Sequence, residues 1–335
     1  MCKRCLLPYN GEIQCEYCDL HDKMEAMPKS LGNIIIQVKQ SGGKYNCLIG
    51  ISGGFDSAIL LDKALEWGLK PLVIHFDNGW NTNEAKHNIE QLTKKVDFIT
   101  YRVNQALYDD VQKSLLLGGT PDADILNDLV MTEIMYRTAV QYKIKYILNG
   151  HNYRTEGSTP REWTYMDARY IESIYGKTVD LPIFRFWDQI IYSLLGIKQL
   201  RPFHHYDFNF EKEKERVMTK YSLQDYGGKH AENVMTDFIG SYLLPIKFGI
   251  DKRLVYLSAM VRSGYVKKED VNLKAFDFGK LAEIDEFLSI KKIMQAPIRE
   301  RSFYKRFPFK RYRLLIWLFV KMGALPYTFY KKYCK

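Results

Sequence analysis

The stretch Ile49–Ser57 reads IGISGGFDS and joins an apolar run to two glycines, two serines and an aspartate. Glycines let a backbone approach an anion closely, and a helix that begins directly afterwards offers unpaired N–H groups with partial positive charge. Ser52 and Ser57 add hydroxyl donors. No lysine occurs between Ile49 and Leu61, so this is not the nucleotide loop that ends in Gly-Lys-Ser/Thr. The stretch predicts a phosphate-binding turn.

The segments on both sides of this turn alternate between strand and helix patterns. Short apolar runs predict strands at residues 45–51, 71–76, 97–103 and 145–150, and helical spacing of apolar residues predicts helices at 57–67, 84–95 and 123–142. This order predicts a doubly wound α/β fold with a parallel sheet, which binds ligands at the carboxyl ends of its strands. Those ends carry the sequences SGGFDS, DNGW and GHNYRTEG, so we expect the three motifs to meet.

Four of the six cysteines lie within the first eighteen residues, as Cys2-x-x-Cys5 and Cys15-x-x-Cys18. Two such pairs are the usual way to hold a tetrahedral zinc ion. Disulfides or free thiols are the alternatives, and the lack of a secretory signal argues against disulfides. We expect a small zinc ribbon in which the metal has a structural role, because four thiolates leave no open coordination position.

The charge balance indicates an anionic partner. The chain of 335 residues has 49 Lys and Arg against 39 Asp and Glu, which gives a net charge of +10. Nucleic acid, a nucleotide-sugar and a membrane surface all fit that sign. The longest apolar run, at residues 314–320, is too short for a membrane span and has basic neighbours. We therefore expect a cytoplasmic protein.

The patterns divide the chain into a zinc ribbon at residues 1–30, an α/β domain at 31–240 and a helical, basic region at 241–335. A polar, aromatic segment at 155–180 predicts an insertion over the sheet edge that acts as a substrate lid. In the tail, basic and aromatic residues alternate from Arg299 to Arg313. We rank packing against the body or partner subunits first for this tail, a peripheral membrane contact second and RNA third.

The hexapeptide SGGFDS, placed between a strand and a helix, resembles the S-G-G-x-D-S signature of the PP-loop ATP pyrophosphatases, which have a HUP-like fold. Members cut ATP between the α- and β-phosphates, transfer AMP to a carbonyl oxygen and release pyrophosphate. The resemblance implies ATP and Mg²⁺ as cofactors, with Asp56 helping to place the metal. It implies nucleotide contacts at Ser52, Gly53, Gly54, Ser57, Asp77, Asn78, Gly150, His151, Asn152 and Arg201.

The acceptor of the AMP needs further evidence. Thiolating relatives need cysteines near the nucleotide, and outside the first eighteen residues this chain has Cys47 and Cys334, which disfavours a tRNA thiolase. The segment at 226–264, with CKRCLLP, CEYC and VIHFDNGWN, resembles the N-acetyl sugar amidotransferases of the WbpG/PseA type. These enzymes serve bacterial O-antigen and flagellin-sugar biosynthesis. The resemblance runs from the cysteines to about Gly264.

This resemblance implies an enzyme that converts the acetamido group of a nucleotide-activated N-acetyl sugar to an acetamidino group. Ammonia comes from a separate HisH-like glutaminase, usually with a HisF-like ammonia-channelling subunit. The catalytic residues that we predict are Asp56, Lys229, Lys247 and Glu156, and the substrate-binding residues are Lys252, Arg253, Asp251 and Arg161. We expect no nucleic acid. A tRNA-modifying enzyme, of thiolation or lysidine type, and a nucleotide-sensing zinc scaffold stay open as alternatives.

Overall fold

The computed structural model describes residues 1–9, 11, 14–158, 167–273, 276–299, 309–323, 325, 327, 330 and 334. A parallel sheet of five strands lies at its centre, in the order β3-β2-β1-β4-β5. The strands are β1 (Cys47–Gly50), β2 (Pro71–Phe76), β3 (Phe98–Tyr101), β4 (Tyr146–Leu148) and β5 (Lys198–Leu200). The strand order reverses between β1 and β4, which is where such sheets open a binding crevice. The predicted doubly wound α/β fold is confirmed.

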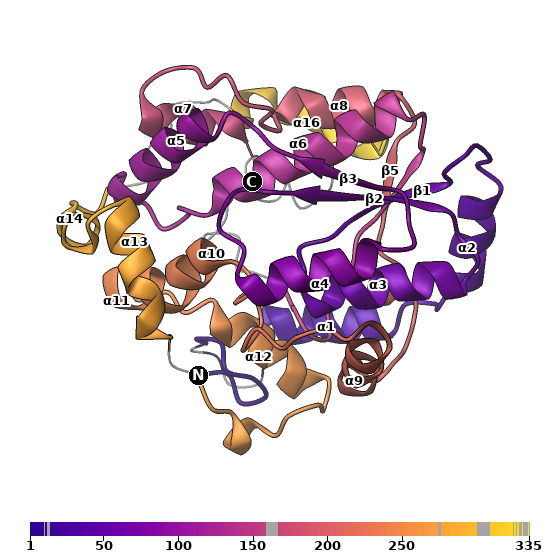
Figure 1. The fold of residues 1–335 in the computed structure, drawn as a ribbon, viewed down its shortest axis with the longest axis horizontal. Coiled ribbons are helices and arrows are strands. Elements are labelled where there is room, and N and C mark those ends of the chain that lie inside the picture. The colour runs from indigo at the N-terminus through magenta and orange to yellow at the C-terminus, as the bar shows by residue number, and fades with distance from the viewer. Residues whose placement is uncertain are drawn as a thin grey trace.

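Helices cover both faces of the sheet (Figure 1). On one face lie α2 (Leu31–Lys39), α3 (Phe55–Glu66), α4 (Asn83–Thr93) and α9 (Phe210–Tyr221). On the other lie α5 (Gln105–Leu117), α6 (Ile125–Gln141), α7 (Ala168–Tyr175) and α8 (Phe186–Leu194). Successive strand residues alternate between the two cores, so Leu48 packs toward α5 to α8 and Ile49 toward α2 to α4. A strand buried on both faces is continuously apolar, as the β1 and β2 runs are.

Most of the C-terminal helices stand beyond the carboxyl ends of the strands (Figure 1). They are α10 (Val234–Phe238), the π-helical turn η3 (Ile239–Leu243), α11 (Leu244–Phe248), α12 (Arg253–Arg262), α13 (Leu281–Phe287) and α14 (Ile290–Gln295). Apart from those of α12, their apolar residues share a separate core with Trp80, which follows β2. The last helix, α16 (Arg313–Lys321), packs against α8 instead.

The N-terminal cysteines are buried next to α12, and the second pair flanks the start of α1 (Glu16–Glu25). The predicted lid at 155–180 is wrong for its last part. There α7 buries Ala168, Tyr170 and Ile171 in the main core, because its apolar residues recur at helical spacing. None of the helices in the described part of the chain is long and apolar enough to cross a bilayer.

Candidate active site

A cavity of about 520 Å³ opens at the carboxyl ends of β1, β2 and β4. The three expected motifs meet in its wall, with Ser52, Gly54, Asp56 and Ser57 from the first, Asn78 from the second, and Gly150, His151 and Glu156 from the third. The opposite wall comes from α6 and from residues 226–256. This arrangement places the phosphate-loop candidate at the topological switch point of the sheet.

The backbone of the SGGFDS turn requires glycine at its centre. Gly53 has φ +85°, and a Cβ there would lie 2.5 Å from the carbonyl oxygen of Ala85 in α4. Ser57 Oγ donates to the Gly54 carbonyl at 2.8 Å and so closes the turn onto the first turn of α3. The amide of Phe55 donates to the Tyr226 hydroxyl at 2.9 Å. The turn is therefore packed against α4 and Tyr226, and its Ser52, Gly54, Asp56 and Ser57 line the cavity.

Lys229 forms the charged centre of this wall. Its Nζ lies 2.9 Å from Asp56 Oδ2 and 3.2 Å from Glu156 Oε1, and none of the three side chains is more than 22% exposed. Burial lowers the pKa of Lys229, but the two carboxylates outweigh it and hold that pKa above its ordinary value. Burial raises the pKa of Asp56, and Lys229 opposes that rise only in part. The cluster joins the first and third motifs through one ammonium group.

Glu232 brings a third carboxylate to the turn. Its Oε1 accepts from Ser52 Oγ at 3.3 Å, its Oε2 has no hydrogen-bond partner, and burial raises the pKa of its carboxyl group. Three acidic groups around a phosphate-binding turn would repel a triphosphate unless a cation lay between them. Asp56 and Glu232 supply the hard oxygen ligands that Mg²⁺ prefers. The residues present therefore fit Mg²⁺.

The third motif packs under the turn. A Cβ on Gly150 would lie 3.2 Å from the Asp56 carbonyl oxygen, so the two segments touch. His151 Nε2 lies 3.6 Å from Glu156 Oε2, and its Nδ1 lies 3.1 Å from Nε2 of His204. Burial lowers the pKa of His151, which favours the neutral imidazole. In this geometry His151 helps to orient Glu156.

Four asparagines link the remaining walls. Asn78 Nδ2 donates to Asn127 Oδ1 of α6 at 2.9 Å, and Asn233 Nδ2 donates to Asn78 Oδ1 at 3.0 Å. Asn81 Nδ2 contacts the buried His75 ring at 2.9 Å. The network ties the loop after β2 to α6 and to the start of α10. It gives the cavity a rigid polar floor, since the amides of Asn78, Asn81 and Asn233 each have more than one partner.

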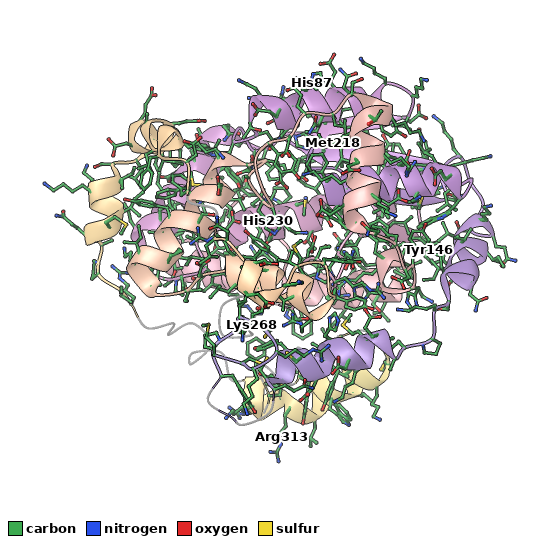
Figure 2. All side chains as sticks on the ribbon, turned by 90° about the horizontal axis from the view of Figure 1, so that it is seen from below. His87, Tyr146, Met218, His230, Lys268 and Arg313 are labelled. Atoms are coloured by element: carbon green, nitrogen blue, oxygen red, sulfur yellow. The ribbon has the colours of Figure 1, made fainter. Side chains whose placement is uncertain are left out.

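The far end of the cavity is acidic. Burial raises the pKa of Asp128 to about 7 and also raises that of Asp124, while Lys252 opposes both shifts. Between this end and the phosphate turn lies His230, with φ +63°, a backbone conformation that is rare for residues other than glycine. Figure 2 shows it among the side chains in the middle of the molecule. Its imidazole is close enough to influence the pKa of Asp56, Glu232 and Asp124.

Several predicted residues lie away from the cavity. Lys247 donates to the Ile293 carbonyl, and Asp251 pairs with Arg253 at 2.7 Å at the start of α12. Asp77 pairs with Arg102 in a separate surface hollow, and the side chain of Asn152 accepts from the Arg154 amide within its own turn. Arg201, before a short 3₁₀ turn, is exposed and is not part of the cavity lining, but its guanidinium is close enough to influence the pKa of His151. Arg161 lies outside the described residues. Lys252 and Arg253 do line the cavity.

The four N-terminal cysteines have the geometry of one four-coordinate ion. Their sulfurs are all within 4.8 Å of one another, and three of the pairs are 3.7 to 3.8 Å apart. A tetrahedron with Zn–S bonds of about 2.3 Å has edges of about 3.8 Å. All four residues are buried and none forms a disulfide. The donor set therefore fits a single metal ion such as zinc.

Helix α12 lies between this cluster and the cavity. Val255 packs against the cysteines and also lines the cavity, and Ser258 Oγ accepts from the amide of Leu6 at 3.1 Å. Lys268 Nζ donates to the carbonyl of Cys2 at 2.7 Å, and Figure 2 shows Lys268 beside the N-terminal segment. The cysteine cluster thus supports one wall of the cavity.

Residues 232–315 match the family model described as LPS biosynthesis protein WbpG-like, C-terminal domain. Over these residues the chain is similar to the C-terminal domain of WbpG-like proteins. The WbpG-like segment begins at Glu232 and includes Asn233, Lys252, Arg253 and Tyr256, all of which line the cavity. The segment therefore faces the phosphate turn across one cavity. Its first residue, Glu232, also hydrogen-bonds to that turn.

The chain is also similar to several individual proteins. An uncharacterized protein of Methanocaldococcus jannaschii, MJ1599, is 24% identical over 271 residues, which is 79% of this chain and 86% of that protein. The U34-tRNA thiolase NcsA from Methanococcus maripaludis, solved with its [4Fe-4S] cluster, is 15% identical with a TM-score of 0.33, covering 88% of this chain and 95% of NcsA. NMN synthetase from Francisella tularensis is 15% identical with a TM-score of 0.28, and the match covers 62% of this chain and 94% of the synthetase.

Proposed function

We propose that this chain is an ATP-dependent amidotransferase that converts the acetamido group of a nucleotide-activated N-acetyl sugar to an acetamidino group, in the biosynthesis of bacterial surface or flagellin glycans. One observation carries the proposal: the phosphate turn and the WbpG-like segment line the same cavity. The turn suits ATP, and the segment suits the sugar. The cavity of about 520 Å³ lies within the usual size range of ligand pockets.

In the first step the acetamido oxygen attacks the α-phosphorus of ATP and pyrophosphate leaves. Ser52, Gly54 and Ser57 bind the departing phosphates. Lys229, which is paired with Asp56, stabilises the negative charge of those phosphates. Asp56 and Glu232 would hold Mg²⁺, which would supply the positive charge that a triphosphate needs to enter this acidic site. The product is the N-protonated O-adenylyl imidate, which keeps the amide proton and whose carbon is electrophilic.

In the second step ammonia adds to that carbon, AMP leaves with the oxygen and an amidinium remains. Ammonium must lose one proton before its nitrogen can attack, and His230 is placed to accept it. Asp124 and Asp128 stabilise the positive charge of the product from the acidic end of the cavity. Ammonia is supplied by a HisH-like glutaminase through a HisF-like subunit, in line with the sequence resemblance.

The test measures pyrophosphate and AMP released from Mg·ATP with acetamido nucleotide-sugars and ammonium chloride, for the wild type and Asp56→Ala. We expect both products only when sugar and ammonia are present, and neither from the variant. Product release that tRNA elicits and sugars do not would replace this proposal with a tRNA-modifying enzyme. ATP binding without pyrophosphate release would favour a nucleotide-sensing scaffold.

A further inference from the structure

Two neighbouring helices turn apolar side chains toward solvent. On α8 these are Trp187, Ile191, Leu194 and the following Leu195, and on α16 they are Leu314, Leu315, Leu318 and the following Met322. All eight are between 46% and 78% exposed. The spacing in each set is helical, so each forms a stripe along one side of its helix. We call the eight residues the α8–α16 face.

The buried sides of the two helices are apolar as well. Ile190 of α8 and Ile316 of α16 are buried together in a small core with Phe309 and Leu325. Figure 1 shows the two helices next to each other, on the side of the sheet that α6 covers. A helix on the surface of a protein usually pairs one apolar side with one polar side. An apolar outer side as well marks a surface that contacts something else.

The last part of the sequence carries the excess of positive charge, and four of its described basic residues lie at α16. Residues 299–335 contain 11 Lys and Arg and one Glu, so subtraction from the totals of 49 and 39 leaves 38 basic and 38 acidic residues in residues 1–298. The whole net charge of +10 therefore resides in the last 37 residues. Lys310, Arg311, Arg313 and Lys321 are exposed around α16, and Figure 2 shows Arg313 at the outer edge of the molecule.

We propose that the α8–α16 face binds the surface of an anionic lipid bilayer. Its aliphatic side chains enter the boundary between headgroups and acyl chains, and the surrounding basic residues contact the anionic headgroups. This inference is independent of the proposed reaction. The described residues of α8 and α16 do not line the cavity, so the bound protein keeps its cavity open.

The residue types of the α8–α16 face favour a lipid bilayer over RNA or a second copy of the chain as its partner. RNA-binding surfaces expose aromatic rings on which bases stack, whereas seven of these eight side chains are aliphatic or methionine. A second copy of the chain would bring an equal positive charge against the same region. An anionic bilayer matches both the apolar stripe and the basic surroundings.

The test is flotation of the full-length protein with vesicles of equal parts phosphatidylcholine and phosphatidylglycerol, beside vesicles of phosphatidylcholine alone. Two variants carry glutamates on separate helices, Leu314→Glu/Leu318→Glu on α16 and Ile191→Glu/Leu194→Glu on α8. A third, Arg311→Glu/Arg313→Glu, reverses charge. The matched controls are Ile246→Glu, an isoleucine of similar exposure on α11, and Lys94→Glu/Lys95→Glu, an exposed basic pair far along the sequence.

We expect the wild type to float with anionic vesicles at low salt and to bind much less to neutral ones. Each basic residue at an anionic surface contributes about fivefold in binding, so losing two costs about 25-fold, and each glutamate pair should cost at least about tenfold. The controls should bind as the wild type does. Failure of the wild type to float would overturn the proposal, and so would equal flotation of all the variants. If no protein binds vesicles but the variants lose a dimer or lose RNA binding, the face is a site for a second copy or for RNA, and the proposal is also overturned.

Discussion

Replacing Lys229 by methionine tests the centre of the candidate site. The change keeps most of the side-chain volume and removes the ammonium group that lies 2.9 Å from Asp56 and 3.2 Å from Glu156. Two carboxylates then remain buried without a counter-charge. Breaking a buried pair by removing one partner costs about 3 to 5 kcal/mol of unfolding free energy. We expect Lys229→Met to lose an amount in that range at neutral pH.

The loss should depend on pH in a defined direction. In the wild type burial raises the pKa of Glu156, but Lys229 and His151 outweigh it, so the pKa is below its ordinary value and this carboxylate stabilises the fold above that value. In the variant the ammonium group no longer opposes burial, so we expect the pKa of both carboxyl groups to rise on folding. The folded variant then binds protons that the unfolded chain has released, and its stability falls as the pH increases. The deficit should shrink toward pH 5, by about 1.4 kcal/mol per pH unit for each proton.

Urea unfolding followed by circular dichroism at several pH values measures both effects. Lys247→Met is the matched control, because Lys247 contacts a carbonyl group and, among the described residues, no carboxylate, so any loss there should not vary between pH 5 and neutral pH. In the double variant Lys229→Met/Asp56→Asn one of the two charges is gone, and about 1 to 2 kcal/mol should return. A loss for Lys229→Met below about 1 kcal/mol at neutral pH, or one that does not change with pH, would refute the reasoning.

Four further predictions use other parts of the molecule. Gly53→Ala should lose at least about 1 to 3 kcal/mol of unfolding free energy in urea, because φ is positive and the new Cβ would meet the Ala85 carbonyl. Cys15→Ser should abolish tight binding of one metal ion per chain, measured by atomic emission, and lower the melting temperature. Asp62→Asn should lose about 1 to 3 kcal/mol in the same urea assay, since the buried carboxylate contacts Tyr221 and the part-exposed Arg216 and Lys220. His230→Asn removes the proposed proton acceptor, so product release should fall about 10²- to 10⁴-fold. The melting temperature should change little, because asparagine tolerates positive φ.

The sequence predicted the elements that have strong local patterns. Strands β1 to β4 and helices α3, α4 and α6 lie where the apolar spacing placed them. Strand β5 was missed because it has three residues, two of which are polar and exposed at the sheet edge. Helix α5 was missed although Asn104 caps its first turn and its buried residues recur at helical spacing, so that signal was present.

Long-range placement limited what could be predicted of the site. The three motifs met as expected because parallel strands bring their carboxyl ends together. Glu232 lies 180 residues from Ser52, and no local pattern indicates that its carboxylate returns to the phosphate turn. Lys229 and Lys247 were equivalent in the sequence, as two lysines in one segment. The structure separates them because α11 turns Lys247 toward α14, whereas Lys229 enters the cavity from the loop before α10.

The position of α12 explains why the cysteine cluster and the WbpG-like segment occur in one chain. The helix belongs to that segment, and its Tyr256 and Arg253 face the cavity while Ser258 bonds to the cysteine-bearing N-terminus. A segment as short as residues 1–25 buries too little apolar surface to hold such a contact by itself. A metal ion that fixes the four cysteines would supply the missing rigidity, because binding free energy becomes folding free energy. In this structure the cavity wall therefore rests on the metal site, although no cysteine reaches the cavity within the described residues.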